Sequence, residues 1–168
     1  MAKVRLNNLR SMVKAGNEQK IIAYLASEGE RLIKLAYASK QTFDDSKNQK
    51  DAYGYRVYLD GREVKTGFVN NTPESDKEHH GWAKHEIPPD TGRGYLMEFF
   101  DEYKPSPKGF ELLVVNAIYY SQILEDGMQN AMHHKYRIIS QIRDNFDNLE
   151  HTLKLRGYKT HVKTIRLG

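Results

Sequence analysis

The histidines are the residues of this sequence whose type points most directly to chemistry. His79, His80 and His85 lie close together, and His133 and His134 are neighbours in a segment that we expect to be helical. Histidine is a common metal ligand and general base, so these clusters raise the hypothesis of a metal site, a hydrolase or a nuclease. Adjacent helical residues point about 100° apart, however, and neither cluster shows the i, i+4 spacing with glutamate that zinc hydrolases use. We therefore predict no metal site and interpret these residues as surface histidines.

Two other short segments have residue types found in catalytic sites. Glu125 and Asp126 have the types of an acid/base pair, but carboxylates at the start of a helix are explained by capping and by the helix dipole. Gly92-Arg93-Gly94 precedes an expected helix, yet it lacks the Lys-Ser/Thr of a P-loop and follows a Pro-Pro loop instead of a strand. The sequence has no Gly-x-Ser-x-Gly and no His-Glu-x-x-His motif. We predict a protein that is not an enzyme and binds no cofactor.

Basic residues gather at both ends of the chain. Residues 1–14 hold four basic residues and no acidic one, and residues 151–168 hold five basic residues and no acidic one. The remaining 17 basic and 22 acidic residues lie between positions 15 and 150, so the middle carries −5 and the ends together carry +9. Such a separation suits nucleic acid, an acidic protein neighbour or head-to-tail association of identical subunits. The alternative is a pair of solvated ends that happen to be basic.

The candidate partner-facing or DNA-facing residues follow from this pattern. The C-terminal tail interleaves Tyr158 and His161 with basic residues, which suits tracking of a phosphate backbone with stacking groups. The single tryptophan stands in a polar stretch, which indicates a contact. The 11 tyrosines favour protein interfaces. The candidates are Arg5, Arg10, Trp82, Arg156, Lys159, Lys163 and Arg166.

Composition excludes several classes of protein. The chain has no cysteine, so it offers no disulfide framework, thiolate metal site or cysteine nucleophile. Its apolar runs are far shorter than the ~18 residues of a membrane span, and Met-Ala-Lys-Val-Arg lacks the apolar core of a signal peptide. We expect a soluble protein without a targeting segment or a membrane partner.

The longest expected elements are a central strand and two helices. Phe110–Tyr120 is apolar except at Glu111 and Asn116, which predicts a strand packed on at least one face by helices. After Gly127, apolar residues at helical spacing predict a long helix that ends near Gly157. A second long helix is expected from Glu18 to about Lys40, and within it Gly29 permits close contact with a neighbouring element or marks a bend.

Shorter elements follow from local patterns. Apolar and polar residues alternate on both sides of Asp60-Gly61, which predicts a β-hairpin over 53–68. Val4–Leu6 is expected to be a short strand or an arm, and 158–167 a final strand or an extended arm. Arg93–Tyr103 predicts a short helix, and 42–51 is polar and turn-like.

These elements make an α+β fold. We expect an antiparallel sheet that includes the hairpin and is packed by a long N-terminal helix and a long C-terminal helix. One domain spans 1–168, with a basic N-terminal arm (1–16), a long loop (70–92) and a basic C-terminal strand or arm (157–168).

Taken in order, the sequence resembles the tail-completion or head-tail joining (neck) proteins of tailed bacteriophages. Three segments carry the resemblance: Val4–Leu9, the end of the first helix at Ala36-Tyr37-Ala38, and Asn116–Gly127. The last is similar to the family's Ala-x-Tyr-Ala-x-(aliphatic)-Glu-x-Gly element, which a long helix also follows. Lys47–Ala52 stands where the family commonly has Asn-Leu-x-x-Ser, and the 70–92 loop is longer than usual.

The resemblance implies a non-enzymatic structural protein of the virion, assembled in the host cytoplasm. Such a head-tail connector or tail-completion subunit forms a homo-oligomeric ring, contacts portal or adjacent neck and tail proteins, and surrounds a channel for genomic DNA without sequence specificity. The alternative is a small nucleic-acid-binding protein that acts through its basic C-terminal tail.

Overall fold

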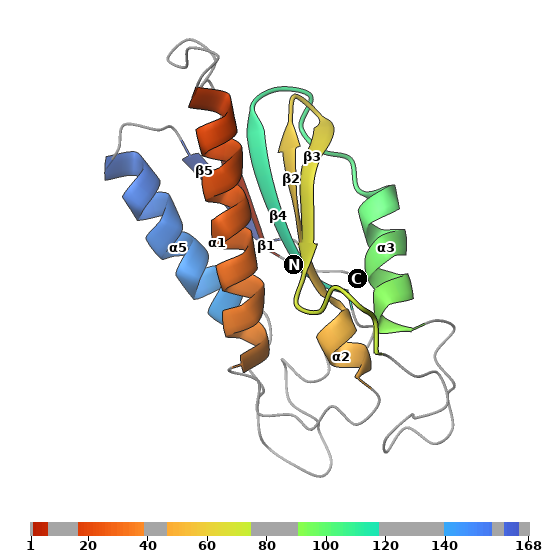
Figure 1. Ribbon diagram of the computed structural model, residues 1–168. Helices are drawn as coiled ribbons and strands as arrows, with labels where there is room; N and C mark the ends of the chain where they lie inside the picture. The colour runs from red at the N-terminus through yellow and green to blue at the C-terminus, as the bar shows by residue number, and fades with distance from the viewer. Residues whose placement is uncertain are drawn as a thin grey trace.

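The computed structural model describes residues 2–6, 17–38, 47–74, 91–117, 140–155 and 160–164 (Figure 1). The fold is α+β with an antiparallel sheet, as the sequence predicts. The strands are β1 (Ala2–Leu6), β2 (Tyr53–Leu59), β3 (Arg62–Phe68), β4 (Phe110–Asn116) and β5 (Thr160–Thr164). The helices are α1 (Glu18–Ala38), α2 (Asn48–Asp51), α3 (Gly92–Glu102) and α5 (Ser140–Leu155). Over these ranges, none of the helices combines the length and the apolar composition of a membrane span.

The strand order in the sheet is β3-β2-β4-β1-β5, and each neighbouring pair is antiparallel. β4 lies in the middle, and all seven of its residues are buried, as its apolar sequence predicts. β1 and β5 come from opposite ends of the chain and pair with each other. The sequence is compatible with a strand or an arm at each end, and residues 2–6 and 160–164 are strands.

The β2–β3 hairpin turns at Asp60 and Gly61, as predicted. Both residues have positive φ, 50° and 80°, which is the pattern of the two-residue turn that matches the twist of a hairpin. The turn is also tied to the start of β4, because the Gly109 amide donates to Asp60 Oδ1 over 3.0 Å. The Asp60 amide donates in return to the Gly109 carbonyl over 2.9 Å. The hairpin tip is thereby held beside the central strand.

α1 and α5 lie on one side of the sheet, and α3 lies on the other (Figure 1). The Tyr55 ring fills a gap that two glycines leave beside it: a Cβ at Gly29 would lie 2.6 Å from the ring, and a Cβ at Gly67 would lie 2.4 Å from it. Gly29 therefore serves close contact, the first of its two predicted roles. This core includes Leu25, Leu32, Ile33, Ala36, Tyr53, Tyr55, Val57, Phe110, Leu112, Val114, Ile142, Phe146, Leu149 and Leu153.

α5 corresponds to the second half of the long helix predicted after Gly127. Its buried residues Ile142, Phe146, Leu149 and Leu153 recur every three or four positions, so one apolar stripe faces the sheet and α1. The predicted first half, before residue 140, lies outside the described residues.

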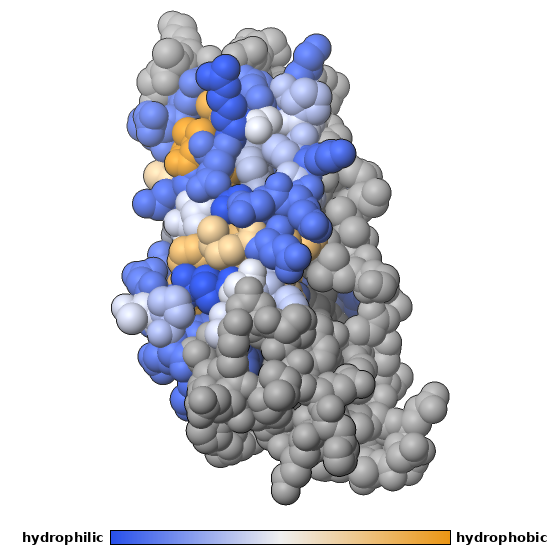
Figure 2. Space-filling model, turned by 90° about the vertical axis from the view of Figure 1, so that its right-hand side faces the viewer, coloured by the Kyte–Doolittle hydropathy of each residue, from blue (hydrophilic) through white to orange (hydrophobic). Residues whose placement is uncertain are grey.

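α3 begins at a capped end and packs through one face. The hydroxyl of Thr91 accepts a hydrogen bond from the Gly94 amide over 3.1 Å. Leu96 and Phe100 then pack against Tyr58, Leu113 and Val115. In Figure 2, which views the molecule from the α3 side of Figure 1, the residues that are coloured are mostly hydrophilic, with apolar residues between them.

α2 corrects the prediction of a turn over 42–51, because residues 48–51 are helical. Lys47 precedes this helix with a φ of 59°, in the left-handed region, and its side chain makes no capping hydrogen bond. The usual sequence signals of a helix start are therefore missing. Three of its polar residues, Asn48, Gln49 and Asp51, are buried, so the contacts that α2 makes with the rest of the chain stabilise it.

Candidate functional site

The structure locates two of the seven candidate partner-facing residues. Arg5 lies in β1 and Lys163 lies in β5. Arg10, Trp82, Arg156, Lys159 and Arg166 lie outside the described residues, as do the histidine clusters and the Glu125-Asp126 pair. Within the described ranges, no three His, Cys, Asp or Glu residues form a group able to hold a metal ion.

The pairing of β1 with β5 brings basic residues from both ends of the chain together. Lys3 stands directly opposite Lys163, and Arg5 stands directly opposite His161. Alternate residues of a strand belong to the same face of its sheet, so these four positions share one face. We call Lys3, Arg5, His161 and Lys163 the basic quartet. Arg5 and Lys163 are among the seven residues predicted to face a partner, and His161 is predicted to lie in the basic tail; the signal for Lys3 is the i, i+2 spacing of basic residues in the first strand.

The register also identifies which face carries the basic quartet. Lys3 pairs with Leu113, which packs against α3, whereas Val4 pairs with Leu112, which belongs to the core under α1 and α5. The basic quartet therefore occupies the α3 face of the sheet, on its β1–β5 half. On the other half of the same face, α3 carries the exposed acidic residues Glu98, Asp101 and Glu102.

Two rows of paired residues cross this face and differ in charge. The first row runs across the strands from β3 to β5 and contains two acidic residues; its members are Glu63, Tyr58, Glu111, Arg5 and His161. The second row also runs from β3 to β5 and contains no acidic residue; its members are Thr66, Arg56, Leu113, Lys3 and Lys163.

Two of these residues, Glu111 and Arg56, have other partners. The carboxylate of the fully buried Glu111 accepts from the Tyr103 hydroxyl and, over 3.1 Å, from the Ser106 amide. The guanidinium of Arg56 lies 3.1 Å from Glu63 and 3.6 Å from Asp101. The cation of Arg56 is thus balanced by two acidic residues.

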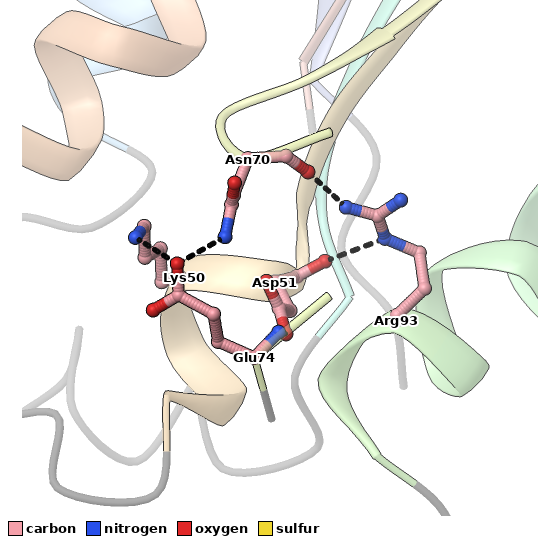
Figure 3. A network of polar contacts seen from close by, with 5 residues as sticks. All are labelled: Lys50, Asp51, Asn70, Glu74 and Arg93. Carbon is pink, nitrogen blue, oxygen red and sulfur yellow. Dashed lines mark hydrogen bonds and ion pairs between the residues drawn. The ribbon is translucent and has the colours of Figure 1, made fainter. Parts of the chain in front are cut away.

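A second candidate site is a polar cluster around α2 (Figure 3). We call Lys50, Asp51, Asn70, Glu74 and Arg93 the α2 polar cluster. Glu74 Oε1 accepts from Lys50 Nζ over 3.2 Å and from Asn70 Nδ2 over 2.7 Å, and the Glu74 amide donates to Asp51 Oδ2 over 2.6 Å. The hydrogen bond from Lys50, followed by that from Asn70, lowers the pKa of the Glu74 carboxyl. The cluster therefore joins α2 to the chain that follows β3.

Arg93 connects the same cluster to α3. Its guanidinium donates to the backbone carbonyls of Asn70 and Asp51 (Figure 3). It also lies 3.7 Å from the centroid of the Phe68 ring, which is the geometry of a cation–π contact. Burial lowers the pKa of the guanidinium, and the charge of Asp51 opposes that shift. Arg93 therefore fixes the first turn of α3 against the end of the hairpin.

The start of α3 shows why Gly92-Arg93-Gly94 does not make a phosphate cradle. The Gly92 amide donates to Asn48 Oδ1 over 2.7 Å, and the Gly94 amide donates to the Thr91 hydroxyl over 3.1 Å. These two N–H groups, which a phosphate would need, are therefore already used within the protein. Gly92 is required for a steric reason, because a Cβ there would lie 1.9 Å from the Asn48 carbonyl oxygen.

The two ends of the 75–90 segment are thus attached to the same short helix. Glu74 is bound by Lys50 and Asp51, and Gly92 is bound by Asn48. The residues on either side of 75–90 are therefore both held at α2, and residues 75–90 of the predicted loop lie outside the described residues.

No protein-family model, curated protein or solved structure matches the chain. The resemblance to phage neck proteins therefore stays a prediction.

Proposed function

We propose that this chain is a structural subunit of a tailed-bacteriophage virion, a neck, head-tail connector or tail-completion protein that assembles into a ring around the DNA channel. In this role it has no catalytic function. It contacts further copies of itself, portal or adjacent neck and tail proteins, and the DNA that passes through the ring. The assembly forms in the host cytoplasm and remains in the virion.

The observation that carries this proposal is the pairing of the two basic ends in one half of the sheet. β1 and β5 belong to the end segments that together carry +9, whereas residues 15–150 carry −5. A subunit whose two end strands pair in one half of its sheet can direct that half toward DNA and leave the acidic remainder for the outside of the ring.

The order of the elements supports the same proposal. A short strand precedes the first long helix, the hairpin follows, and the central strand β4 leads into the segment that resembles the family's tyrosine-containing element. β4 lies between β2 and β1, in the middle of the sheet, and the resembling segment follows β4 in the sequence. All seven residues of β4 are buried.

The test is the mass of the protein in solution, measured by native mass spectrometry and light scattering at high protein concentration. The measurement is made alone and with portal protein and tail components. We expect a closed oligomer, alone or on addition of a neighbouring component. A strict monomer that binds none of these components would overturn the proposal.

A further inference from the structure

The link between α3 and β4, residues 103–109, packs against the tip of the β2–β3 hairpin, at the end of the molecule opposite α2 (Figure 1). Two hydrogen bonds, of 2.9 and 3.0 Å, join Asp60 to Gly109, 49 positions further along the chain. A Cβ at Gly61 would lie 3.4 Å from the Ser106 carbonyl oxygen, so the hairpin turn and the link touch each other. Two distant segments therefore form one surface at this end.

The link is held in one conformation by the interior of the protein. The fully buried carboxylate of Glu111 accepts from the Tyr103 hydroxyl and from the Ser106 amide, which are two separate points of the link. The Ser106 hydroxyl donates to the Lys108 carbonyl over 3.1 Å. Two prolines of the link fix φ at further positions. A surface held in this way loses little conformational entropy when it binds a partner.

Three exposed cations lie along this contact. Arg62 follows the hairpin turn, and Lys104 and Lys108 belong to the link. Among the residues that the structure describes, none of these three side chains has an ion-pair or hydrogen-bond partner. By contrast, the exposed cation of Lys34 on α1 is paired with Glu30 at 2.5 Å. We call Arg62, Lys104 and Lys108 the hairpin-tip cations; their charge is available to an anionic partner.

We propose that the hairpin-tip cations form a docking surface for an acidic segment of a partner protein. The carboxylates of that segment pair with the three cations, and the anchored link keeps the cations in place before the partner arrives. The inference goes beyond the proposed function, because it identifies a protein-binding surface by its chemistry and requires neither a ring nor DNA.

The charges beside the hairpin-tip cations favour a protein over nucleic acid as the partner. Glu98 and Glu102 are exposed on the last turns of α3, and the chain runs from them directly into the link. A phosphate backbone carries closely and regularly spaced negative charges, so these carboxylates would repel it. A protein segment can instead place carboxylates against the cations and neutral or basic groups against the two glutamates.

The experiment compares two double variants of the full chain that change net charge equally. Lys104→Gln with Lys108→Gln removes two of the hairpin-tip cations. Lys20→Gln with Lys34→Gln removes two exposed lysines of α1, on the other side of the sheet from α3. The probe is a fluorescein-labelled peptide of repeated Glu-Gly-Ser units, and its binding is followed by fluorescence anisotropy at low salt. A peptide of repeated Gln-Gly-Ser units is the uncharged control.

We expect the Lys104/Lys108 variant to bind the acidic peptide about tenfold more weakly, because each exposed ion pair contributes a factor of a few to affinity. The α1 variant should bind it like the unchanged protein, and the uncharged peptide should not bind. Equal losses in the two variants, or no binding of the acidic peptide to the unchanged protein, would overturn the inference. So would a mixed-sequence DNA duplex that binds more tightly than the peptide and depends on the same two lysines, because the partner would then be nucleic acid.

A chemical readout locates the contact without any substitution. A carbodiimide activates the carboxylates of the bound peptide, which then form amide bonds with the lysine amines that they contact. Mass spectrometry should find the peptide joined to Lys104 and Lys108 and not to Lys20 or Lys34. Cross-links spread equally over all four lysines would refute the docking surface.

A further variant tests the anchored link by itself. Glu111→Gln keeps all three hairpin-tip cations but removes an acceptor that holds the link, so it should also weaken binding of the acidic peptide. An affinity equal to that of the unchanged protein would contradict the role assigned to the anchored link.

Discussion

Replacing Arg93 by methionine should lower the free energy of unfolding by about 3 kcal/mol, because one side chain makes three contacts. Its guanidinium donates to two backbone carbonyls from separate segments and covers the Phe68 ring at 3.7 Å. Hydrogen bonds from a charged donor contribute about 1.5–3 kcal/mol each, and a cation–π contact contributes about 0.5–2 kcal/mol. We take the lower part of these ranges because the site is partly exposed and water can replace some contacts. Methionine retains much of the side-chain volume, so the loss reports mainly on the polar contacts and the ring contact.

The assay is urea unfolding followed by far-ultraviolet circular dichroism near pH 7. With an m value of about 2 kcal/mol/M, a loss of about 3 kcal/mol moves the midpoint down by about 1.5 M. In thermal unfolding the same loss corresponds to about 9 °C for a chain of this length. Arg93→Lys should be nearly as damaging as methionine, because an ammonium cannot reproduce the planar fork that reaches two carbonyls and stacks on a ring.

The matched control is Arg31→Met on α1. Arg31 is an exposed arginine whose partner is Glu28 at 2.9 Å, and a pair of this kind contributes about 0–1 kcal/mol. If Arg93→Met and Arg31→Met destabilise the protein by the same amount within about 0.5 kcal/mol, the role assigned to Arg93 is wrong.

Three other changes test separate parts of the fold. Gly29→Ala should lower the free energy of unfolding by about 1 kcal/mol, because the new Cβ would lie 2.6 Å from the Tyr55 ring and this overpacking outweighs the better helix propensity of alanine. Adding Tyr55→Leu should remove this loss, and a loss of the same size in the double variant would refute the explanation. Glu111→Gln should cost about 2 kcal/mol in urea unfolding, because the Tyr103 hydroxyl and the Ser106 amide donate to different oxygens of the carboxylate and one of these becomes an NH₂ group that cannot accept. A change below about 0.5 kcal/mol would contradict it. Burial, with the charge of Glu30 second, raises the pKa of the Tyr55 hydroxyl above its ordinary 10.0, so stability should be full below pH 10.0 and fall as the pH rises through the folded pKa. Tyr55→Phe should make this alkaline fall smaller, and an unchanged pH profile would show that Tyr55 does not cause it.

The elements that the sequence predicts well are those that short-range patterns specify. Asp60-Gly61 defines the hairpin because both of its turn residues adopt positive φ. The apolar run from Phe110 identifies the strand that occupies the middle of the sheet. The spacing of apolar residues in α1 follows from the period of a helix, and the described helix, Glu18–Ala38, lies within the predicted range.

The elements that the sequence does not predict depend on contacts between distant segments. α2 has no capping side chain, and it is held by bonds such as those from Glu74 and Gly92, which lie 23 and 44 residues from their partners. The basic quartet is a second case, because the alternation in each end strand fixes which residues share a face but not which strands are neighbours. That information lies in the pairing of β1 with β4 and β5, which connects residues more than 100 positions apart.

The outer strands of the described sheet restrict how copies of the proposed subunit can associate. Along β3, Arg62, Glu63 and Lys65 are exposed and charged, and the pairing with β2 shifts register between Val57 and Tyr58. Charged side chains and register irregularities both oppose the addition of a further strand. β5, the outer strand on the opposite side, contributes Lys163, and an identical strand placed against it would add more positive charge. Within the described residues, both sheet edges therefore disfavour joining by strand pairing, and we infer that ring contacts come from helices and loops.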